Sequence, residues 1–279
     1  MAASGKLDGR PGPWFDPAML RLLAVALLVA TFAAGSLRAG EWKLVWSDEF
    51  DQPGRPDPAK WGYEEGKIRN HEAQSYTRDR AENARVEDGN LVITGRRERS
   101  PGEPPADYTS ASLTTEGKAS WTYGRIEVRA KLPRGRGMWP AIWTLGTNIR
   151  TVDWPRCGEI DIMEFVGKEP GTIHGTLHYS QDGKHRSSQG HAPIADAGVG
   201  FHTYAVEWWP DRVDFFFDGG KYHTVPLEAG QGDAFHRPHY LILNLALGGD
   251  WGGPIDDAVL PQSFLIDYVR VYQQEGTHP

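Results

Sequence analysis

The feature that most constrains the fold is residues 154–167, WPRCGEIDIMEFVG, which place three carboxylates among strand-forming apolar residues. In a β-strand successive side chains point to opposite faces, so Glu159 and Asp161 share one face while the two isoleucines of the stretch share the other, buried face. A regular strand would also bury Glu164, and burying an unpaired ionised carboxylate in an apolar core is costly. We therefore predict one extra residue near Met163, a β-bulge that returns Glu164 to the face of Glu159.

Three acids on one face suit a chemistry that needs a carboxylate nucleophile beside a protonated carboxylic acid, and glycoside hydrolysis is that chemistry. Crowded like charges push pKa values apart, so one Glu can stay ionised while another holds its proton near neutral pH. Asp161 would couple the two. The alternative is an edge strand with a solvated acidic face.

The sequence GEIDIMEF resembles the signature of glycoside hydrolase family 16, and its extra Met resembles the bulged laminarinase-type (endo-1,3-beta-glucanase) branch. Lichenase-like and xyloglucan-active members lack that residue. The resemblance covers residues 41–272 and implies an all-β fold, a concanavalin-like β-jelly-roll sandwich of two curved antiparallel sheets with a concave substrate cleft. It also implies that Glu159 is the nucleophile, Glu164 the general acid/base and Asp161 the residue that tunes them.

Tryptophans flank the acidic stretch and are candidates for sugar binding. Trp139 and Trp143 lie four residues apart in GMWPAIWTLG, so a strand would place both indoles on one face. Trp154 directly precedes the acidic strand. Flat aromatic rings stack on pyranose rings with a large contact area at low entropy cost. Tryptophan is also a common core residue, so packing is the alternative for each.

Polar residues in three other segments are further candidates. Asn70, in NHEAQSYT, belongs to a stretch that resembles the family's cleft loop, where Asn70 and Glu72 would bind sugar hydroxyls while Gln74 and Tyr76 only pack. The alternative is a polar loop over the sandwich.

His178 lies on the polar face of GTIHGTLHYS, and the family resemblance suggests that it reaches the acid/base pair or a sugar hydroxyl. A metal shared by His174 and His178 is disfavoured, because residues four apart on a strand are about 13 Å apart. Residues 181–200, with His185 and His191, read as a polar loop with no assigned chemistry. In YLILNLALGGDWGG, Asn244 is an inward polar contact and Trp251 closes one end of the cleft.

The resemblance also implies a structural calcium on the convex side, since Glu49 and Asp267 match ligand positions of the family, with the carbonyl of Gly89 as a third. Oxygen ligands suit calcium. Asp267 equally suits the cap of a turn. No cofactor is expected for catalysis.

Residues 1–39 read as an N-terminal extension and signal peptide, with a single catalytic domain at 40–279. Arg21 precedes thirteen mostly apolar residues, 22–34, and small residues end near Ala39. The apolar run is short for a membrane span of about 20 residues, although an uncleaved anchor is the alternative. Met19 is a second candidate start. We expect secretion after cleavage and no membrane contact in the mature form.

A net charge of −7 disfavours nucleic acid and is compatible with a neutral polysaccharide. Cys157 is the only cysteine, so no intramolecular disulfide is possible, and we expect it to be a packed residue. A monomer is expected.

We conclude that the sequence predicts a secreted, retaining endo-β-glucanase that cleaves β-1,3 bonds by double displacement, with mixed-linkage β-1,3/1,4-glucans as further substrates. That mechanism expects carboxyl groups about 5–5.5 Å apart. The alternatives are an agarase- or carrageenase-type galactan hydrolase on the same motif, and a non-catalytic β-glucan recognition module. A lectin-like domain would explain the aromatic residues but not the three acids.

Overall fold

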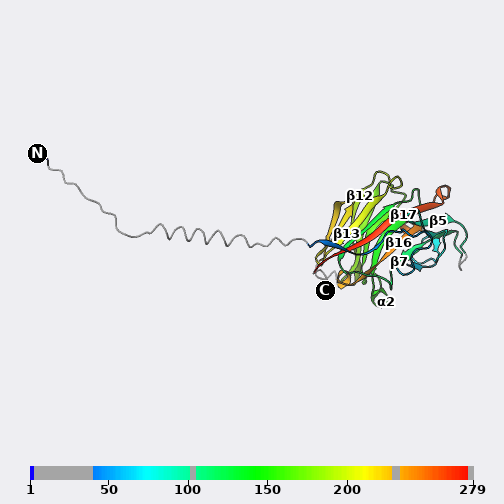
Figure 1. Ribbon diagram of the computed structural model, residues 1–279, viewed down its shortest axis with the longest axis horizontal. Coiled ribbons are helices and arrows are strands. Elements are labelled where there is room, and N and C mark those ends of the chain that lie inside the picture. Colours follow the sequence, from blue (N-terminus) through cyan, green and yellow to red (C-terminus); the bar gives the residue numbers. More distant parts are fainter. Residues whose placement is uncertain (3–39, 101–104, 228–232, 276–279) are drawn as a thin grey trace. The chain divides into compact units, whose positions relative to one another are not determined.

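The computed structural model describes residues 1–2, 40–100, 105–227 and 233–275 (Figure 1). Residues 41–279 form one compact unit. The predicted leader falls on residues 3–39 and so lies outside the described residues. Within the described part of the chain, no helix combines the length and the apolar character that crossing a membrane requires.

Two β-sheets make up this unit. The ten-stranded sheet has the order β15 (Gly220–Pro226), β14 (Arg212–Phe217), β13 (His202–Trp208), β8 (Gly124–Lys131), β17 (Gln262–Gln274), β5 (Asn90–Arg97), β6 (Tyr108–Ser110) and β3 (Gln74–Tyr76), with β1 (Trp42–Asp48) paired to β17 and β4 (Ala84–Glu87) paired to β5. The seven-stranded sheet has the order β12 (Lys184–Pro193), β11 (Thr172–Gln181), β10 (Glu159–Phe165), β9 (Met138–Gly146), β16 (His239–Leu247), β7 (Ser112–Thr114) and β2 (Gly62–Glu64). Short helical turns lie between strands: α2 (Ile149–Val152), η1 (Asp233–His236), α3 (Gly249–Gly252) and η2 (Asp257–Val259).

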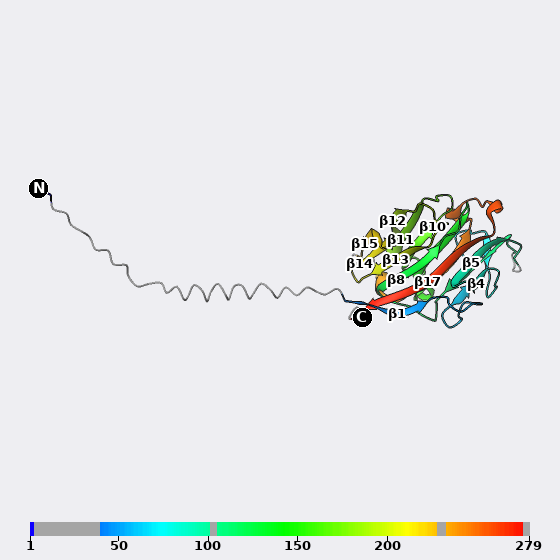
Figure 2. The same ribbon diagram turned by 45° about the horizontal axis from the view of Figure 1, so that its top comes forward.

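The first and last strands lie side by side. β1 pairs antiparallel with β17, from Trp42 opposite Gln274 to Asp48 opposite Val269, which brings the two ends of the unit together (Figure 2). Apart from the short parallel pair β3 and β6, the paired strands are antiparallel. The prediction of an all-β sandwich of two sheets is confirmed.

The core lies between the sheets. β8 alternates between apolar and charged residues, with Ile126, Val128 and Ala130 buried and the charged residues between them half-buried. These side chains belong to one apolar cluster with Ile160 and Leu243 of the seven-stranded sheet. One face of the seven-stranded sheet is therefore turned toward the other sheet, and we call the opposite face its outer face.

Two-residue turns with left-handed backbone join several neighbouring strands. Asp88 and Gly89 (φ 51° and 72°) join β4 to β5 in a hairpin, as the sequence Asp-Gly favours. Asp182 and Gly183 (φ 52° and 69°) join β11 to β12 in the same way. The prediction of a loop over residues 181–200 is therefore wrong for residues 184–193. Those residues form a sheet strand that is polar on both faces, so hydrophobic alternation gave no indication of it.

Candidate active site

A β-bulge in β10 places the acidic residues. On the neighbouring strand β9, Trp143 lies opposite Asp161 and Ile142 lies opposite Met163, so two residues of β10 advance while β9 advances by one. The extra residue confirms the predicted bulge. Because the bulge shifts the alternation by one position, Glu164 joins the earlier acids on the outer face.

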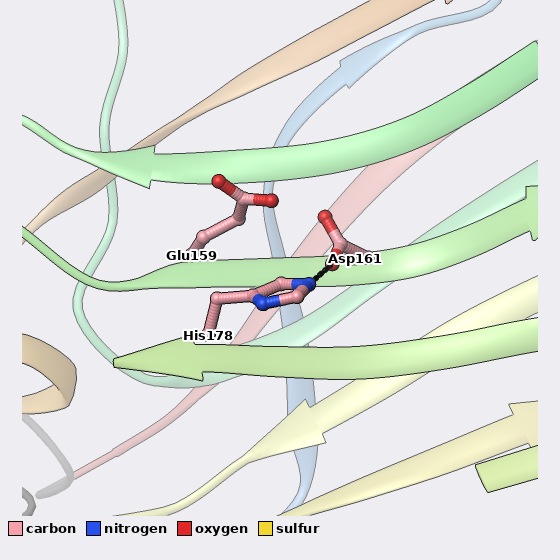
Figure 3. A group of neighbouring side chains, drawn as sticks. All are labelled: Glu159, Asp161 and His178. Carbon is pink, nitrogen blue, oxygen red and sulfur yellow. Dashed lines mark ion pairs between the residues drawn. The ribbon is translucent and has the colours of Figure 1, made fainter. Parts of the chain in front are cut away.

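Three groups converge on that face (Figure 3). One carboxylate oxygen of Glu159, one of Asp161 and one ring nitrogen of His178 all lie within 4.8 Å of one another. The carboxylates come from β10 and the imidazole from β11, and His178 Nε2 lies 3.2 Å from Asp161 Oδ2. The structure thus brings His178 to the acids, as expected.

The acids open into a cleft of about 680 Å³. Its walls include most of the predicted sugar-binding residues and three further charged groups: Glu159, Asp161, Glu164, Asn70, Glu72, Trp139, Trp143, Trp154, Asn244, Arg69, Glu64 and Glu116. A cleft of this volume, lined by aromatic and polar side chains, is typical of a small-ligand or oligosaccharide site.

Burial governs the protonation of the three acids. The pKa of Glu164 is raised to about 7, because burial and the charge of Glu159 together outweigh a hydrogen bond from Trp139 that lowers it. Burial and the charge of Asp161 raise the pKa of Glu159, and burial and the charge of Glu164 raise that of Asp161. The cluster therefore holds at least one proton near neutral pH, so a proton donor and an ionised carboxylate can coexist here.

Two of the three predicted tryptophans bind the catalytic candidates by their edges. Trp139 Nε1 donates to Glu164 Oε1 at 3.0 Å, and Trp154 Nε1 donates to Glu159 Oε2 at 2.8 Å. Trp154 is 45 % exposed, whereas Trp139 is only 8 % exposed. Each indole therefore orients a carboxylate, and Trp154 also leaves ring surface open to a ligand.

The third tryptophan begins a buried hydrogen-bond chain. Trp143 Nε1 donates to Asn244 Oδ1 at 2.7 Å, Asn244 Nδ2 donates to the Tyr76 hydroxyl at 3.0 Å, and that hydroxyl donates to Glu72 Oε2 at 3.0 Å. All four side chains are at least nine-tenths buried. The orientation of Trp143 in the cleft thus depends on a carboxylate three links away.

The loop that precedes β3 supplies the rest of this network. Asn70 Nδ2 donates to Glu72 Oε1 at 3.2 Å and Gln74 Nε2 donates to Glu72 Oε2 at 2.7 Å. Our expectation that Gln74 and Tyr76 only pack is wrong, because both hold the Glu72 carboxylate. Burial raises the pKa of Glu72.

Arg69 is a cleft residue that the sequence did not reveal. Its guanidinium group lies 4.7 Å from the centre of the Trp143 ring and is paired with Glu64. Trp143 is distant in sequence, and Glu64, five residues before Arg69, lies at the end of β2 and has no helical or strand spacing to it. The position of Arg69 directly before the cleft-loop stretch was the one available indication.

Trp251 contacts Trp139, a residue of the cleft wall. Its ring meets Trp139 edge-on at 5.7 Å between centroids and His174 at 4.9 Å. The loop that carries Trp251 is bonded to the cleft loop, since Asp250 N donates to Asn70 O at 2.9 Å. That Trp251 closes one end of the cleft stays a prediction.

The residues predicted to bind calcium lie on the other sheet, away from the acids. Glu49 accepts two hydrogen bonds from Arg270, at 3.0 and 2.8 Å, and Asp267 is paired with Arg129. The Arg270 hydrogen bonds lower the pKa of Glu49. Gly89 lies in the turn between β4 and β5. A calcium ion at these side chains would have to compete with both guanidinium groups for the two carboxylates.

Comparisons with known proteins give matches over most of the chain. Residues 71–270 match the family described as Glycosyl hydrolases family 16. A β-glucanase of Rhodothermus marinus is 45% identical over 267 residues, which cover 89% of this chain and 92% of that protein. The X-ray structure of the laminarinase of Rhodothermus marinus has a TM-score of 0.78 at 46% identity, covering 85% of this chain and 99% of the other.

A second solved structure is similar to the same degree. It is a variant of a non-specific endo-β-1,3(4)-glucanase from family 16, co-crystallised with 1,3-β-D-cellotriosyl-glucose, and it has a TM-score of 0.77 at 44% identity. The match covers 84% of this chain and 95% of the other.

Proposed function

The chain belongs to glycosyl hydrolase family 16, and from this premise we propose that it is a retaining endo-β-glucanase that hydrolyses β-1,3-glucosidic bonds. The observation that carries the proposal is the bulged strand β10, which presents Glu159 and Glu164 on one face of a cleft. The pKa of Glu164, about 7, suits a group that must donate and then accept a proton near neutral pH.

The proposed reaction has two displacements. Glu159 attacks the anomeric carbon while Glu164 transfers its proton to the leaving glycosidic oxygen, so the C–O bond to the leaving sugar breaks as the glycosyl–Glu159 bond forms. Water then attacks the same carbon, Glu164 takes the proton of the water, and the carboxylate of Glu159 leaves. Two inversions give net retention.

The contacts of the two glutamates support these roles. Glu159 accepts from Trp154, and the nearby His178 also favours its ionised form. Glu164 is kept protonated to higher pH by its burial and by the charge of Glu159. Asp161 lies between them and would couple their protonation.

The cleft favours a neutral polysaccharide. Its walls carry seven carboxyl groups, from Glu64, Glu72, Glu116, Asp153, Glu159, Asp161 and Glu164, against two guanidinium groups, from Arg69 and Arg150. A sulfated galactan would meet electrostatic repulsion there. We therefore favour a β-1,3-glucan over a carrageenan, with mixed-linkage β-1,3/1,4-glucans as additional substrates in line with the 1,3(4)-glucanase neighbour.

Catalysis by this family member needs no cofactor. Secretion with removal of residues 1–39, a monomeric state, and a calcium ion at Glu49, Gly89 and Asp267 remain our proposals. N-terminal sequencing of exported protein tests the first, and sedimentation tests the second. An unchanged melting temperature after chelation and calcium addition would count against the third.

The test of the function is reducing-end release by the purified protein from laminarin, mixed-linkage glucan, agarose and carrageenan. Activity on laminarin that vanishes in Glu159→Gln supports both the substrate and the nucleophile. Activity on agarose or carrageenan alone would keep the mechanism and overturn the substrate. A folded protein that binds laminarin without cleaving any of the four would overturn the enzyme assignment for this chain.

A further inference from the structure

His185 lies beside the candidate active site, although its segment carries no recognised motif. The two-residue turn at Asp182 and Gly183 fixes the register of β12 on β11, with His185 opposite Ser180 and Ser187 opposite His178. His185 is thus the diagonal neighbour of His178 on the outer face, a separation that ring side chains can bridge.

The ring of His185 joins two separate arms of the site. Its Nε2 lies 2.9 Å from Nδ1 of His178, and Nε2 of His178 lies 3.2 Å from Oδ2 of Asp161. Its ring also lies 4.6 Å from that of Trp154, whose indole N–H donates to Glu159. The five side chains form a continuous series of contacts from Glu159 through Trp154, His185 and His178 to Asp161.

We propose that His185 is a positioning residue that fixes the tautomer of His178 and the orientation of Trp154, and so supports Asp161 and Glu159. This inference rests on the proposed function for the catalytic roles of the two carboxylates. It assigns no contact between His185 and the reacting atoms. His185 acts through its neighbours.

The rings of His185 and His178 share one proton. An N···N hydrogen bond between two imidazoles holds a single proton, and which ring donates it determines the tautomer of the other. When His185 Nε2–H donates, Nδ1 of His178 is an acceptor and the proton of neutral His178 sits on Nε2, toward Asp161. Asp161 is 2 % exposed, and its Oδ2 forms no hydrogen bond within the described part of the chain, although Nε2 of His178 lies 3.2 Å away. A proton on Nε2 of His178 would therefore stabilise this oxygen, because an unsatisfied buried carboxylate oxygen is costly.

The ring of His185 also restricts the orientation of Trp154. This indole is 45 % exposed, and its hydrogen bond to Glu159 is made from the open side of the site. A ring packed against one face reduces the number of rotamers open to the indole and so favours the one that reaches Glu159. Losing the ring at position 185 would leave Trp154 freer to turn away.

The groups that face His185 are few. From β11 the titratable neighbour is His178, and from the segment before β10 the neighbour is the uncharged Trp154. Asp161 and Glu159 lie behind these two. Burial, and secondarily the proximity of His178, lowers the pKa of His185, which favours the neutral form of this ring.

Three variants separate the two parts of the proposal. His185→Phe keeps a ring against Trp154 and removes the nitrogen, His185→Gln restores a hydrogen-bonding amide near the position of Nε2, and His191→Phe is the same exchange on the same strand, opposite His174. We expect kcat on laminarin to fall about fivefold in His185→Phe with KM within about twofold, the size expected for one partly exposed hydrogen bond. The acid limb of the pH profile should move to higher pH, because Asp161 loses support for its ionised form. His185→Gln should restore the acid limb but recover only part of kcat, because it lacks the ring that packs against Trp154. His191→Phe should leave kcat and the acid limb unchanged.

A second readout does not depend on activity. Imidazole ¹⁵N shifts should show His178 as the Nε2–H tautomer in the wild-type protein and in His185→Gln, and as a mixture of tautomers in His185→Phe. An identical His178 tautomer in wild type and His185→Phe, with unchanged near-UV circular dichroism, would overturn the proposal. So would an equal loss of kcat in His191→Phe. If the wild-type protein cleaves no glucan, the proposed function fails, while the ¹⁵N shifts still decide what His185 does to His178.

Discussion

The indole N–H of Trp139 on β9 donates a 3.0 Å hydrogen bond to Oε1 of Glu164 on β10. Ala141 lies directly opposite Glu164, so Trp139 reaches the carboxyl from the diagonal position two residues away. The bond favours the ionised form of Glu164, against the burial that raises its pKa to about 7. Trp139 therefore keeps the pKa of Glu164 lower than burial alone would make it.

Replacing that indole should move one limb of the pH profile. In Trp139→Phe the pKa of Glu164 loses a contribution that lowers it, so the basic limb of kcat/KM, which follows loss of the acid's proton, should shift to higher pH. The optimum rate should stay within about tenfold, since one hydrogen bond is lost. Trp251→Phe, which alters a ring that touches Trp139 but not this bond, should leave the basic limb in place. Equal shifts in both variants would show that packing, not the hydrogen bond, is responsible.

Glu164 should also make stability depend on pH. Its pKa is raised in the folded protein from an ordinary value of 4.5 to about 7, so the protonated side chain contributes stability that is fully present below about pH 4.5 and is lost as pH rises through 7. Glu164→Gln cannot ionise and should be more stable than wild type at pH 8 by about 2 kcal/mol, with a much smaller difference at pH 4.5. Urea unfolding at the two pH values measures this. The exposed Glu82→Gln serves as the control, and parallel pH profiles for wild type and Glu164→Gln would contradict the burial argument.

The two glutamates should be distinguishable by chemical rescue. Glu159→Ala and Glu164→Ala should each lose about 10⁴-fold or more in kcat/KM on laminarin. With an aryl β-glucan oligosaccharide, azide should restore turnover in both variants. Azide replaces the missing nucleophile in Glu159→Ala and inverts the anomeric carbon once, giving an α-glycosyl azide. In Glu164→Ala it attacks the glycosyl-enzyme and gives the β-azide. Product NMR that reports the opposite anomers would exchange the two roles.

The buried chain from Trp143 to Glu72 should respond to loss of one hydroxyl. Tyr76→Phe leaves Asn244 Nδ2 without its acceptor and removes one donor from Glu72, so we expect a loss of about 1–3 kcal/mol in unfolding free energy together with a higher KM. Tyr63→Phe is the matched control, because the buried hydroxyl of Tyr63 has no hydrogen-bond partner among the described residues. That variant should be neutral or slightly stabilising. Equal losses in the two variants would mean that ring packing, not the hydroxyl, determines the effect.

Local patterns predicted the catalytic strand well. The order of apolar and acidic residues in residues 154–167 was enough to infer a bulge, because the cost of burying Glu164 excludes the regular strand. The same alternation rule placed Trp139 and Trp143 on one face. In each case the physical cause acts within a few residues along the chain.

Contacts between distant segments were beyond such rules. The Asn244 amide meets the Tyr76 hydroxyl across 168 positions of sequence, and nothing local to either residue indicates the pairing. β12 was missed for another reason. It is an edge strand that is polar on both faces, so its backbone pairing with β11, and not apolar burial, holds it in the sheet. The Asp182-Gly183 turn was the available indication of that strand, and with it His185 would have been placed on the outer face.

Whether the two glutamates face the same way depends on whether the number of positions between them along the strand is odd or even. Glu159 and Glu164 are separated by an odd number of positions, and on a strand of period two such residues face opposite ways unless one position is absorbed. A strand shortened by Met163 would be regular and would present the same three acids on the same face, four positions apart. Bulged and regular strands are thus two solutions to one constraint, related by a single codon. An intermediate that kept the residue but straightened the strand would hide its acid in the core.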